Sequence, residues 1–293
     1  MVSLKLISNC VESLVFVFKG GRVLSVQNSV IKGNWALILG ASSGFGEAIS
    51  LKLAEAGMHI FGIHLDRKST IANVERVISQ IKEMGGQVAF FNINAADPVK
   101  RKETVDHIES VLKENENASV IKVLVHSLAF GTLKPYISSS QNEIVTESNM
   151  NMTLDVMAHS LVYWVQELVL RKLMVSGGRI FAMTSAGGHR VWPTYGPVSA
   201  AKAALEAHIR QLAFELASLG ITANAIRAGV TKTPALHRIP GSETIIKKAL
   251  EANPSGRLTT PKDVAEAIVA LSQSGTHWIT GNIIGVDGGE DLI

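Results

Sequence analysis

The sequence contains a single cysteine, Cys10, among its 293 residues. One cysteine excludes an internal disulfide framework and any metal centre built from several thiolates. It also fits a reducing, cytoplasmic location, where disulfides are rare. The nine histidines show no metal-ligand spacing, so we assign no metal site.

Long apolar runs are absent as well. No run reaches the roughly 18 residues that a membrane-spanning helix needs, and Glu12, Lys19 and Arg22 interrupt an N-terminal region that lacks the order of a signal peptide. The net charge is only +3, with no block of basic residues of the kind that follows a phosphate backbone. We therefore expect no export, no membrane span and no nucleic-acid partner.

From Trp35 onward, short apolar runs alternate with amphipathic stretches. We expect seven strands, at residues 35–39, 60–63, 88–93, 120–125, 179–183, 221–226 and 282–286. Helical spacing of apolar residues predicts helices at residues 46–55, 70–84, 98–113, 150–174, 198–218 and 261–272. The strands read as continuous apolar runs rather than alternating ones, as strands buried on both faces should. This pattern predicts an α/β fold, a doubly wound, parallel, seven-stranded Rossmann-type sheet in a single domain at residues 32–293.

Two segments depart from this alternation. In residues 1–31, two β-rich runs flank Lys19-Gly20-Gly21, so this N-terminal extension is either a β-hairpin or a disordered or sheet-edge segment. In residues 234–258, proline and glycine cluster. A long loop in an otherwise compact domain often acts as a lid or a substrate wall.

The turn after the first strand, Gly40-Ala41-Ser42-Ser43-Gly44-Phe45-Gly46, is rich in glycine. Glycines let the backbone turn tightly and approach a pyrophosphate, while the following helix offers unpaired N–H groups and a partial positive charge. An ordinary strand-to-helix turn is the alternative interpretation. The position of the turn, between an apolar strand and an amphipathic helix, favours dinucleotide binding.

The second strand ends before Asp66, Arg67 and Lys68. An acidic residue here holds the adenosine ribose hydroxyls of NAD, whereas arginine or lysine pairs with the 2′-phosphate of NADP. The two basic residues favour NADPH over NADH, and Ser43, where many NADPH-dependent reductases carry a basic residue, argues the other way. A solvated loop of charges is the alternative for each of the three.

A further group of polar residues follows the fifth strand. Ser185 ends that strand, Tyr195 follows ten residues later, and Lys202 lies seven residues beyond it on an amphipathic helix that we expect to begin near Pro197. Taken singly, Tyr195 is a surface tyrosine and Lys202 a helix-face lysine. Their order behind a glycine turn instead indicates a catalytic set.

From about Lys32 onward, the chain resembles the short-chain dehydrogenase/reductase superfamily. The resemblance rests on the glycine turn, the Ser185, Tyr195 and Lys202 set, the segment 228–233 and the closing Val286-Asp287-Gly288-Gly289. Most members place the tyrosine four residues before the lysine, where this chain has Val198.

The seven-residue separation instead resembles a divergent branch, the enoyl-acyl-carrier-protein reductases of bacterial fatty-acid synthesis. His126-Ser127-Leu128-Ala129-Phe130-Gly131 is similar to that branch, and the segment 203–207 is most similar to its type III reductases. The catalytic asparagine of most superfamily members falls on Met157, which cannot relay a proton.

The resemblance implies roles for further residues. Thr233 contacts the nicotinamide carboxamide or, alternatively, caps the helix before Pro234, while Tyr136 is expected only to pack. The implied substrate is an acyl-carrier-protein or coenzyme A thioester. The resemblance also implies that the chain forms a homotetramer. The implied cofactor contacts are Gly40, Ser42, Ser43, Gly44, Phe45, Gly46, Asp66, Arg67, Lys68, Asn94, Ala95, Ser127, Leu128, Ala129, Lys202, Gly229, Val230, Thr231 and Thr233.

A physical argument supports the spacing. In an enoyl thioester, hydride goes to Cβ while negative charge develops on the thioester oxygen, further away than in a simple ketone. A tyrosine displaced by almost one helical turn can meet that oxygen, and the charge of Lys202 is expected to lower the pKa of Tyr195. The leading hypothesis is enoyl thioester reduction. The alternatives are a 3-oxoacyl thioester or other carbonyl reductase and, less favoured, a non-catalytic nucleotide-binding protein.

Overall fold

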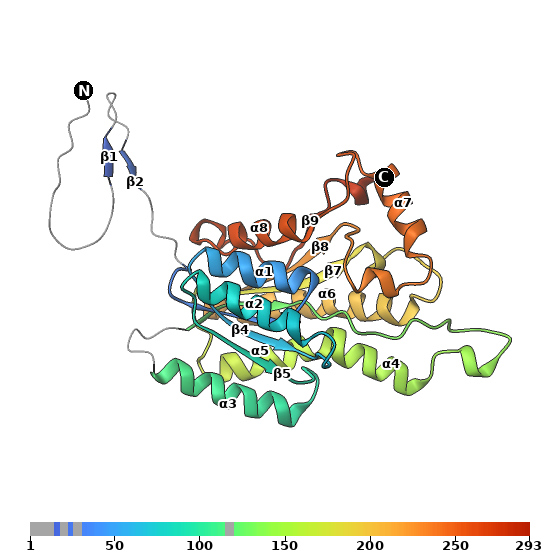
Figure 1. Cartoon of the computed structure of the whole chain (residues 1–293), viewed down its shortest axis with the longest axis horizontal. Helices are drawn as coiled ribbons and strands as arrows, with labels where there is room; N and C mark the ends of the chain where they lie inside the picture. The colour runs from blue at the N-terminus through green and yellow to red at the C-terminus, as the bar shows by residue number, and fades with distance from the viewer. Residues whose placement is uncertain (1–14, 18–22, 26–30, 115–119) are drawn as a thin grey trace.

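A seven-stranded parallel sheet forms the centre of the molecule (Figure 1). The computed structural model describes residues 15–17, 23–25, 31–114 and 120–293. The strands lie in the order β5-β4-β3-β6-β7-β8-β9, which confirms the predicted doubly wound sheet. Their bounds are β3 (Trp35–Leu39), β4 (His59–His64), β5 (Val88–Asn92), β6 (Ile121–His126), β7 (Arg179–Ser185), β8 (Thr222–Ala228) and β9 (Ile283–Val286).

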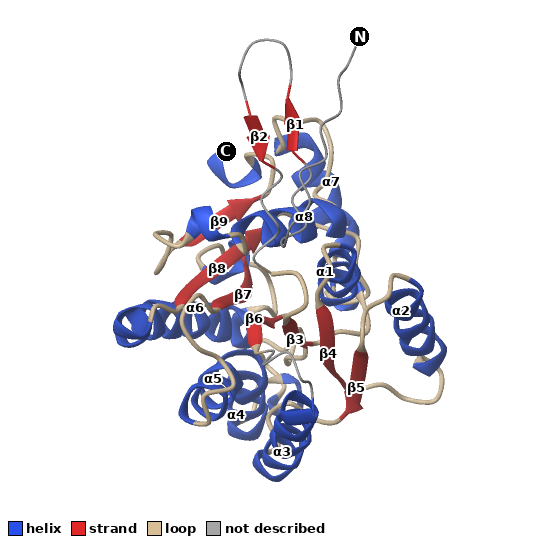
Figure 2. Ribbon diagram, turned by 90° about the vertical axis from the view of Figure 1, so that its left-hand side faces the viewer, coloured by secondary structure: helices blue, strands red, loops and turns tan. Residues whose placement is uncertain are grey.

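Helices cover both faces of this sheet, as Figure 2 shows. On β3, Leu37 packs into a core with α3 (Pro98–Glu114), α5 (Ser160–Leu170) and α6 (Gly196–Leu216), and the next residue, Ile38, packs into a second core. The second core contains residues of α1 (Gly44–Glu55), α2 (Ile71–Glu83) and α8 (Pro261–Leu271). Alternate residues of each strand therefore face opposite helical layers.

The strand order reverses between β3 and β6. From β3 the chain continues to β4 and β5 on one side, and it returns to β6 on the other. In open α/β sheets, ligands bind outside the carboxyl ends of the strands at such a switch point. The fold thus places the glycine turn after β3 and the Ser127 segment after β6 side by side.

Two predicted segments differ from the observed structure. The helix expected at 150–174 is α4 (Glu147–Leu154), a π-helical turn (Asp155–His159) and α5 in succession. It begins earlier because Thr146 caps it through a hydrogen bond from the backbone N–H of Asn149. The segment 234–258 is not only a loop, because it contains the helix α7 (Ser242–Ala252). Proline and glycine flank this stretch but do not interrupt it, so a helix can form between them.

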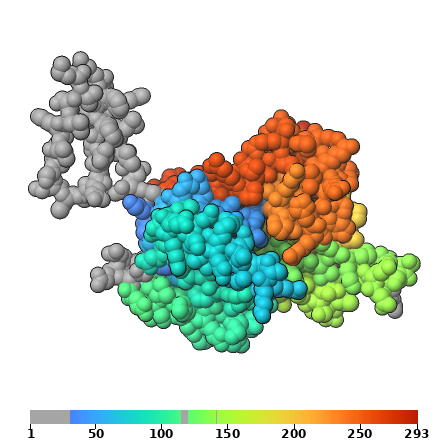
Figure 3. Space-filling model, viewed as in Figure 1, coloured from blue at the N-terminus to red at the C-terminus, as the bar shows by residue number. Residues whose placement is uncertain are grey.

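We call α7 the lid helix, because it lies in the segment 234–258 for which a lid was the expectation. The residues of α7 (orange) and of α4 (yellow-green) lie toward the same end of the molecule (Figure 3). In the N-terminal extension, β1 (Val15–Val17) pairs antiparallel with β2 (Val23–Ser25), and residues 18–22 between them lie outside the described residues. Among the described helices, none combines the length and the hydropathy that crossing a membrane requires.

Candidate active site

The glycine turn is too tightly folded to accept side chains. A Cβ built on Gly46 would lie 1.9 Å from the carbonyl oxygen of Gly40, and one on Gly40 would lie 2.5 Å from that of Ser127. Gly40 has a φ of +91° and Gly44 a φ of +57°, values that favour glycine. The turn leads directly into α1, whose first N–H groups have no partners within the helix. This bare, close-packed backbone forms the kind of cradle that a pyrophosphate needs.

Asp66 lies beside this cradle, at the carboxyl end of β4. Its carboxylate is 3.0 Å from Nδ1 of His64, and burial would raise its pKa. Hydrogen bonds from Ser42 and Thr70, together with His64, outweigh burial and leave the pKa of Asp66 below its ordinary value. Asp66 is therefore ionised and faces Ser42 of the glycine turn, whereas Arg67 and Lys68 are exposed.

Asn94 and Ala95, two of the implied cofactor contacts, follow β5. The side chain of Asn94 accepts a hydrogen bond from the backbone N–H of Ala96, and the carbonyl of Ala95 accepts one from Nε1 of Trp164. Asn94 and Leu65 line a hollow of about 550 Å³. After β6, the N–H of Ser127 donates to the carbonyl of Leu39, which fixes this segment against the glycine turn. Leu128 is half-buried and Ala129 exposed.

The segment after β8 closes the opposite side. Thr233 faces the glycine turn, because its methyl carbon lies 3.5 Å from a Cβ built on Gly44. Its Oγ1 accepts a hydrogen bond from the N–H of Leu236, the first residue of a short 3₁₀ helix (Leu236–Arg238) whose N-cap position is Ala235. Thr231 donates to the carbonyl of Gly229. The N–H of Val230 donates to the carboxylate of Glu290.

Ser185 and Tyr195 meet at Gly187. A Cβ on Gly187 would lie 2.5 Å from Cε1 of Tyr195 and 3.3 Å from Oγ of Ser185. Burial raises the pKa of Tyr195, and the Ser185 hydroxyl opposes this in part. The prediction that Lys202 lowers this pKa is wrong, because the shift comes from burial and from Ser185 and the charge of Lys202 takes no part in it. Tyr195 therefore stays protonated at neutral pH.

Lys202 is buried on α6, with its Nζ donating to the carbonyl of Met183 at 2.6 Å. Burial lowers the pKa of Lys202 to about 8, and Glu206, one turn further along the helix, partly opposes this. Glu206 accepts a hydrogen bond of 2.6 Å from Oγ1 of Thr184, beside Ser185 on β7. Lys202 therefore stays charged at pH 7 and is held between two elements of the site.

Apolar side chains surround Tyr195 on one side. Met157 and Val198 pack together in a small buried cluster, and Tyr195 packs against it. Met157 belongs to the π-helical turn, a local irregularity that often occurs at functional sites. The two positions that carry a proton-relaying asparagine and a tyrosine in most of the superfamily are thus buried and apolar here.

Tyr136 packs, as expected: its Cζ lies 2.6 Å from a Cβ built on Gly196. Two residues near the site, Glu206 and Glu290, were not predicted from the sequence, and Glu206 lies one helical turn after Lys202. The carboxylate of Glu290 accepts from the N–H of Val230 at 3.0 and 3.2 Å. Glu206 was detectable, since it lies four residues after Lys202 on the same helix face. Glu290 was not, because its contact spans 60 residues.

The predicted site residues thus lie along one edge of the sheet, from Asp66 past the glycine turn to Thr233. The glycine cradle and the ionised Asp66 fit a dinucleotide such as NAD(P)H: the turn would hold its pyrophosphate and Asp66 its adenosine ribose. Lys202, Tyr195 and Ser185 lie toward the other end, where the nicotinamide would bind. Among the described residues, no group of three or more histidine, cysteine, aspartate or glutamate side chains could hold a metal ion.

Comparison with known proteins gives consistent matches. The family model described as enoyl-(acyl carrier protein) reductase matches residues 40–290. The chain is 30% identical to an NADPH-dependent aldehyde reductase-like protein of Arabidopsis thaliana over 88% of this chain and 94% of that protein. It is 28% identical to a 1-cyclohexenylcarbonyl-CoA reductase of Streptomyces collinus over 91% and 90%. The crystal structure of an NADH-dependent enoyl-[acyl-carrier-protein] reductase of Aquifex aeolicus superposes with a TM-score of 0.76 at 25% identity, over 90% of this chain and 98% of that one.

Proposed function

The chain belongs to the enoyl-(acyl carrier protein) reductase family of short-chain dehydrogenases/reductases, which are NAD(P)H-dependent oxidoreductases, and we propose that it reduces the trans-2 double bond of an enoyl thioester. One observation carries this proposal. Tyr195 lies seven residues before Lys202, while Val198 and Met157, at the positions of the usual tyrosine and asparagine, are buried in an apolar cluster. A relative named for a CoA thioester with an adjacent ring double bond supports the same chemistry.

When bound, the nicotinamide nucleotide supplies the hydride that goes to Cβ of the substrate. The residues of the chain act on the other end of the conjugated system. Tyr195, protonated at neutral pH because burial raises its pKa, donates a hydrogen bond to the thioester oxygen as negative charge develops there. The charged Lys202 holds the nucleotide ribose and adds a positive potential near the same oxygen.

Apolar side chains are exposed on the two segments that adjoin Tyr195. Val191 lies four residues before Tyr195 and is exposed. Tyr136, on the segment after β6, packs on Gly196 directly after Tyr195, and Phe130 and Ile137 of the same segment are exposed. Large exposed apolar side chains are candidates for a binding surface, and an acyl chain that contacted them would bury them.

A carbonyl or 3-oxoacyl thioester reductase is the second candidate. It is favoured by the proximity of Ser185 to Tyr195 at Gly187, since a hydroxyl pair can polarise a ketone. The relative named as an aldehyde reductase-like protein supports it too. The apolar Met157 argues against it, because Met157 replaces the asparagine that relays protons in most of the superfamily. Proton delivery to an alkoxide would lack that asparagine.

The carrier and the assembly extend the proposal. We propose an acyl-carrier-protein or coenzyme A thioester as substrate in fatty-acid synthesis, with NADPH or NADH as reductant. We also propose a homotetramer. Leu170 of α5 and Phe214 of α6 are each 80% exposed, and contact between copies of the chain would bury them. A cytoplasmic location stays a prediction of the sequence.

The test follows nucleotide absorbance with crotonyl-CoA and with acetoacetyl-CoA, using NADPH and NADH in parallel. Reduction of crotonyl-CoA with deuterium transfer from 4-deuterated nucleotide to C3 of the product supports the proposal. Oxidation of nucleotide with acetoacetyl-CoA alone replaces it by the carbonyl reductase. Turnover of neither substrate, with tight nucleotide binding, points to the nucleotide-binding protein.

A further inference from the structure

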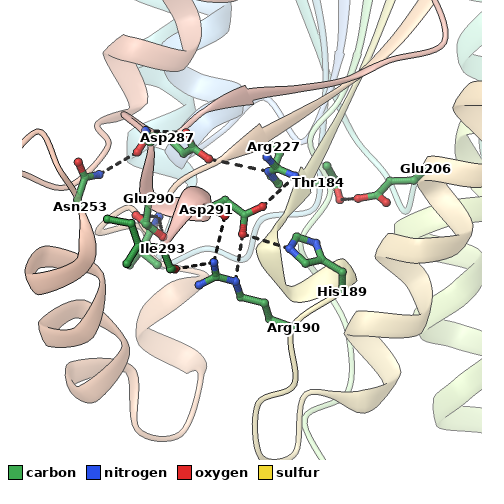
Figure 4. Close-up of polar contacts among 12 residues, drawn as sticks. Thr184, His189, Arg190, Glu206, Arg227, Asn253, Asp287, Glu290, Asp291 and Ile293 are labelled. Atoms are coloured by element: carbon green, nitrogen blue, oxygen red, sulfur yellow. Dashed lines mark hydrogen bonds and ion pairs between the residues drawn. The ribbon is translucent and has the colours of Figure 1, made fainter.

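The segment 287–293, after β9, contacts three separate parts of the candidate site (Figure 4). One part is the loop of residues 186–195, which carries Tyr195 and is called the Tyr195 loop below. The second is the segment of residues 229–233 after β8, called the nicotinamide segment because Thr233 was expected to contact the nicotinamide. The third is the end of the lid helix α7. Such contacts place one short segment in a position to set the geometry of all three.

Asp291 makes the contacts to the Tyr195 loop. Its Oδ1 is 3.1 Å from Nε2 of His189 and 3.1 Å from Nε of Arg190. Its Oδ2 is 2.9 Å from a guanidinium nitrogen of Arg227 on β8. Arg190 also donates to the carbonyl of Ile293 at 2.9 Å. One carboxylate thus joins the loop to the sheet.

The neighbouring contacts hold the segment itself in place. Glu290 accepts from the N–H of Val230, and Asn253 at the end of α7 donates to the carbonyl of Asp287 at 2.8 Å. Ser255 donates to the carbonyl of Gly288. The backbone that carries Asp291 is therefore fixed to both the nicotinamide segment and the end of the lid helix.

The Tyr195 loop needs such support because its backbone is strained. Thr194, the residue directly before Tyr195, has a φ of +63°. For a β-branched residue this left-handed conformation is an outlier that persists only where surrounding contacts impose it. Loss of the support would let Thr194 relax and would move the tyrosine that follows it.

We propose that Asp291 is a positioning residue, which holds the Tyr195 loop so that the Tyr195 hydroxyl meets the substrate oxygen. An exposed ion pair would contribute little. The Asp291 side chain, however, is only 9% exposed and pairs with Arg227, which is 26% exposed, as well as with the more exposed His189 and Arg190. Removing its charge therefore breaks the link between the Tyr195 loop and β8. This inference rests on the proposed function insofar as it concerns catalysis.

The test compares Asp291→Asn with wild type and with Asp106→Asn, a control that removes a carboxylate paired with Arg171 on the outer helices. We expect kcat of Asp291→Asn for crotonyl-CoA to fall roughly 10- to 100-fold, the scale of a misplaced catalytic group. KM and nucleotide Kd should change less than about twofold, since no binding contact is removed. Asp291→Glu should restore part of the rate, and Asp106→Asn should behave as wild type.

A second readout does not depend on the reaction. Trypsin cleaves after Arg190 only when the Tyr195 loop opens, so Asp291→Asn should be cut there faster than wild type and Asp106→Asn should not. If wild type reduces no enoyl thioester, the proposed function fails while this cleavage still tests the contact. Should Asp291→Asn fail to fold, Arg190→Gln removes the same contact from the loop side and should show the same loss of kcat at unchanged KM.

Unchanged kcat in a folded Asp291→Asn, or equal cleavage after Arg190 in variant and wild type, would overturn the positioning role. A parallel loss of kcat, nucleotide affinity and thermal stability would also overturn it, because general destabilisation would then explain the result.

Discussion

Replacing Lys202 by methionine should make the protein more stable at neutral pH while it abolishes catalysis. Burial lowers the pKa of Lys202 from 10.5 to about 8. At about 1.36 kcal/mol per pKa unit, keeping this lysine charged in the folded state costs about 3 kcal/mol at pH 7. Methionine fills a similar volume without charge but loses the hydrogen bond to the carbonyl of Met183, which costs about 1 kcal/mol. The expected net gain is about 2 kcal/mol.

The pH dependence of this gain has a definite sign. Between about pH 8 and 10.5 the unfolded chain still binds the proton of Lys202 and the folded chain has lost it, so wild-type stability rises with pH in this window. The advantage of Lys202→Met should therefore shrink by about 2 kcal/mol at a pH of about 9.5. His126, whose pKa the charge of Lys202 helps to lower to about 3, is neutral over this pH range, and the remaining groups cancel in the difference.

Urea denaturation of nucleotide-free wild type and Lys202→Met at the two pH values measures this difference. Lys82→Met, which changes an exposed lysine on α2, is the control and should show no comparable pH-dependent gain. A Lys202→Met variant that is less stable than wild type at pH 7, or whose advantage is equal at both pH values, would refute the reasoning.

Three further predictions concern separate parts of the molecule. Gly187→Ala should lower kcat roughly tenfold or more, because its Cβ would lie 2.5 Å from the ring of Tyr195. The control Gly275→Ala, where a Cβ meets no described atom within 4 Å, should leave kcat unchanged. Steady-state kinetics compare the two variants, and equal rates would contradict the close contact. Asp66→Asn should shift the ratio of kcat/KM values from NADH towards NADPH by roughly tenfold, because a charge that repels a 2′-phosphate is removed; an unchanged ratio would mean that Asp66 does not face the ribose. Phe214→Glu should dissociate the proposed tetramer in sedimentation velocity, and an undiminished tetramer would place the interface elsewhere.

Most of the sheet could be predicted from the sequence because its five inner strands, β4, β3, β6, β7 and β8, are buried on both faces. Such strands read as uninterrupted apolar runs, and the turn after β3 must be glycine at Gly46, where no side chain fits. The lid helix α7 was missed because the prolines and glycines at its ends indicate a loop. The π-helical turn at Asp155–His159 was missed because it continues directly from α4 into α5, with no glycine or proline to mark it.

The proposed catalytic set was accessible from sequence because Ser185, Tyr195 and Lys202 are close in the chain. The contacts that hold the set in place were not accessible. Glu290 and Asp291 contact residues that lie 60 to 102 positions earlier in the sequence, and no local sequence pattern indicates such a contact. The direction of the Tyr195 pKa shift also needed the structure, since the balance of burial against charge depends on what surrounds the phenol.

The single-turnover rate of Tyr195→Phe with saturating nucleotide and crotonyl-CoA tests the central claim most directly. The variant keeps the ring that packs at Gly187 and loses only the hydroxyl. We predict a rate roughly 100-fold below wild type, with nucleotide Kd unchanged. A variant that reduces crotonyl-CoA at the wild-type rate would remove Tyr195 from the mechanism and contradict the account.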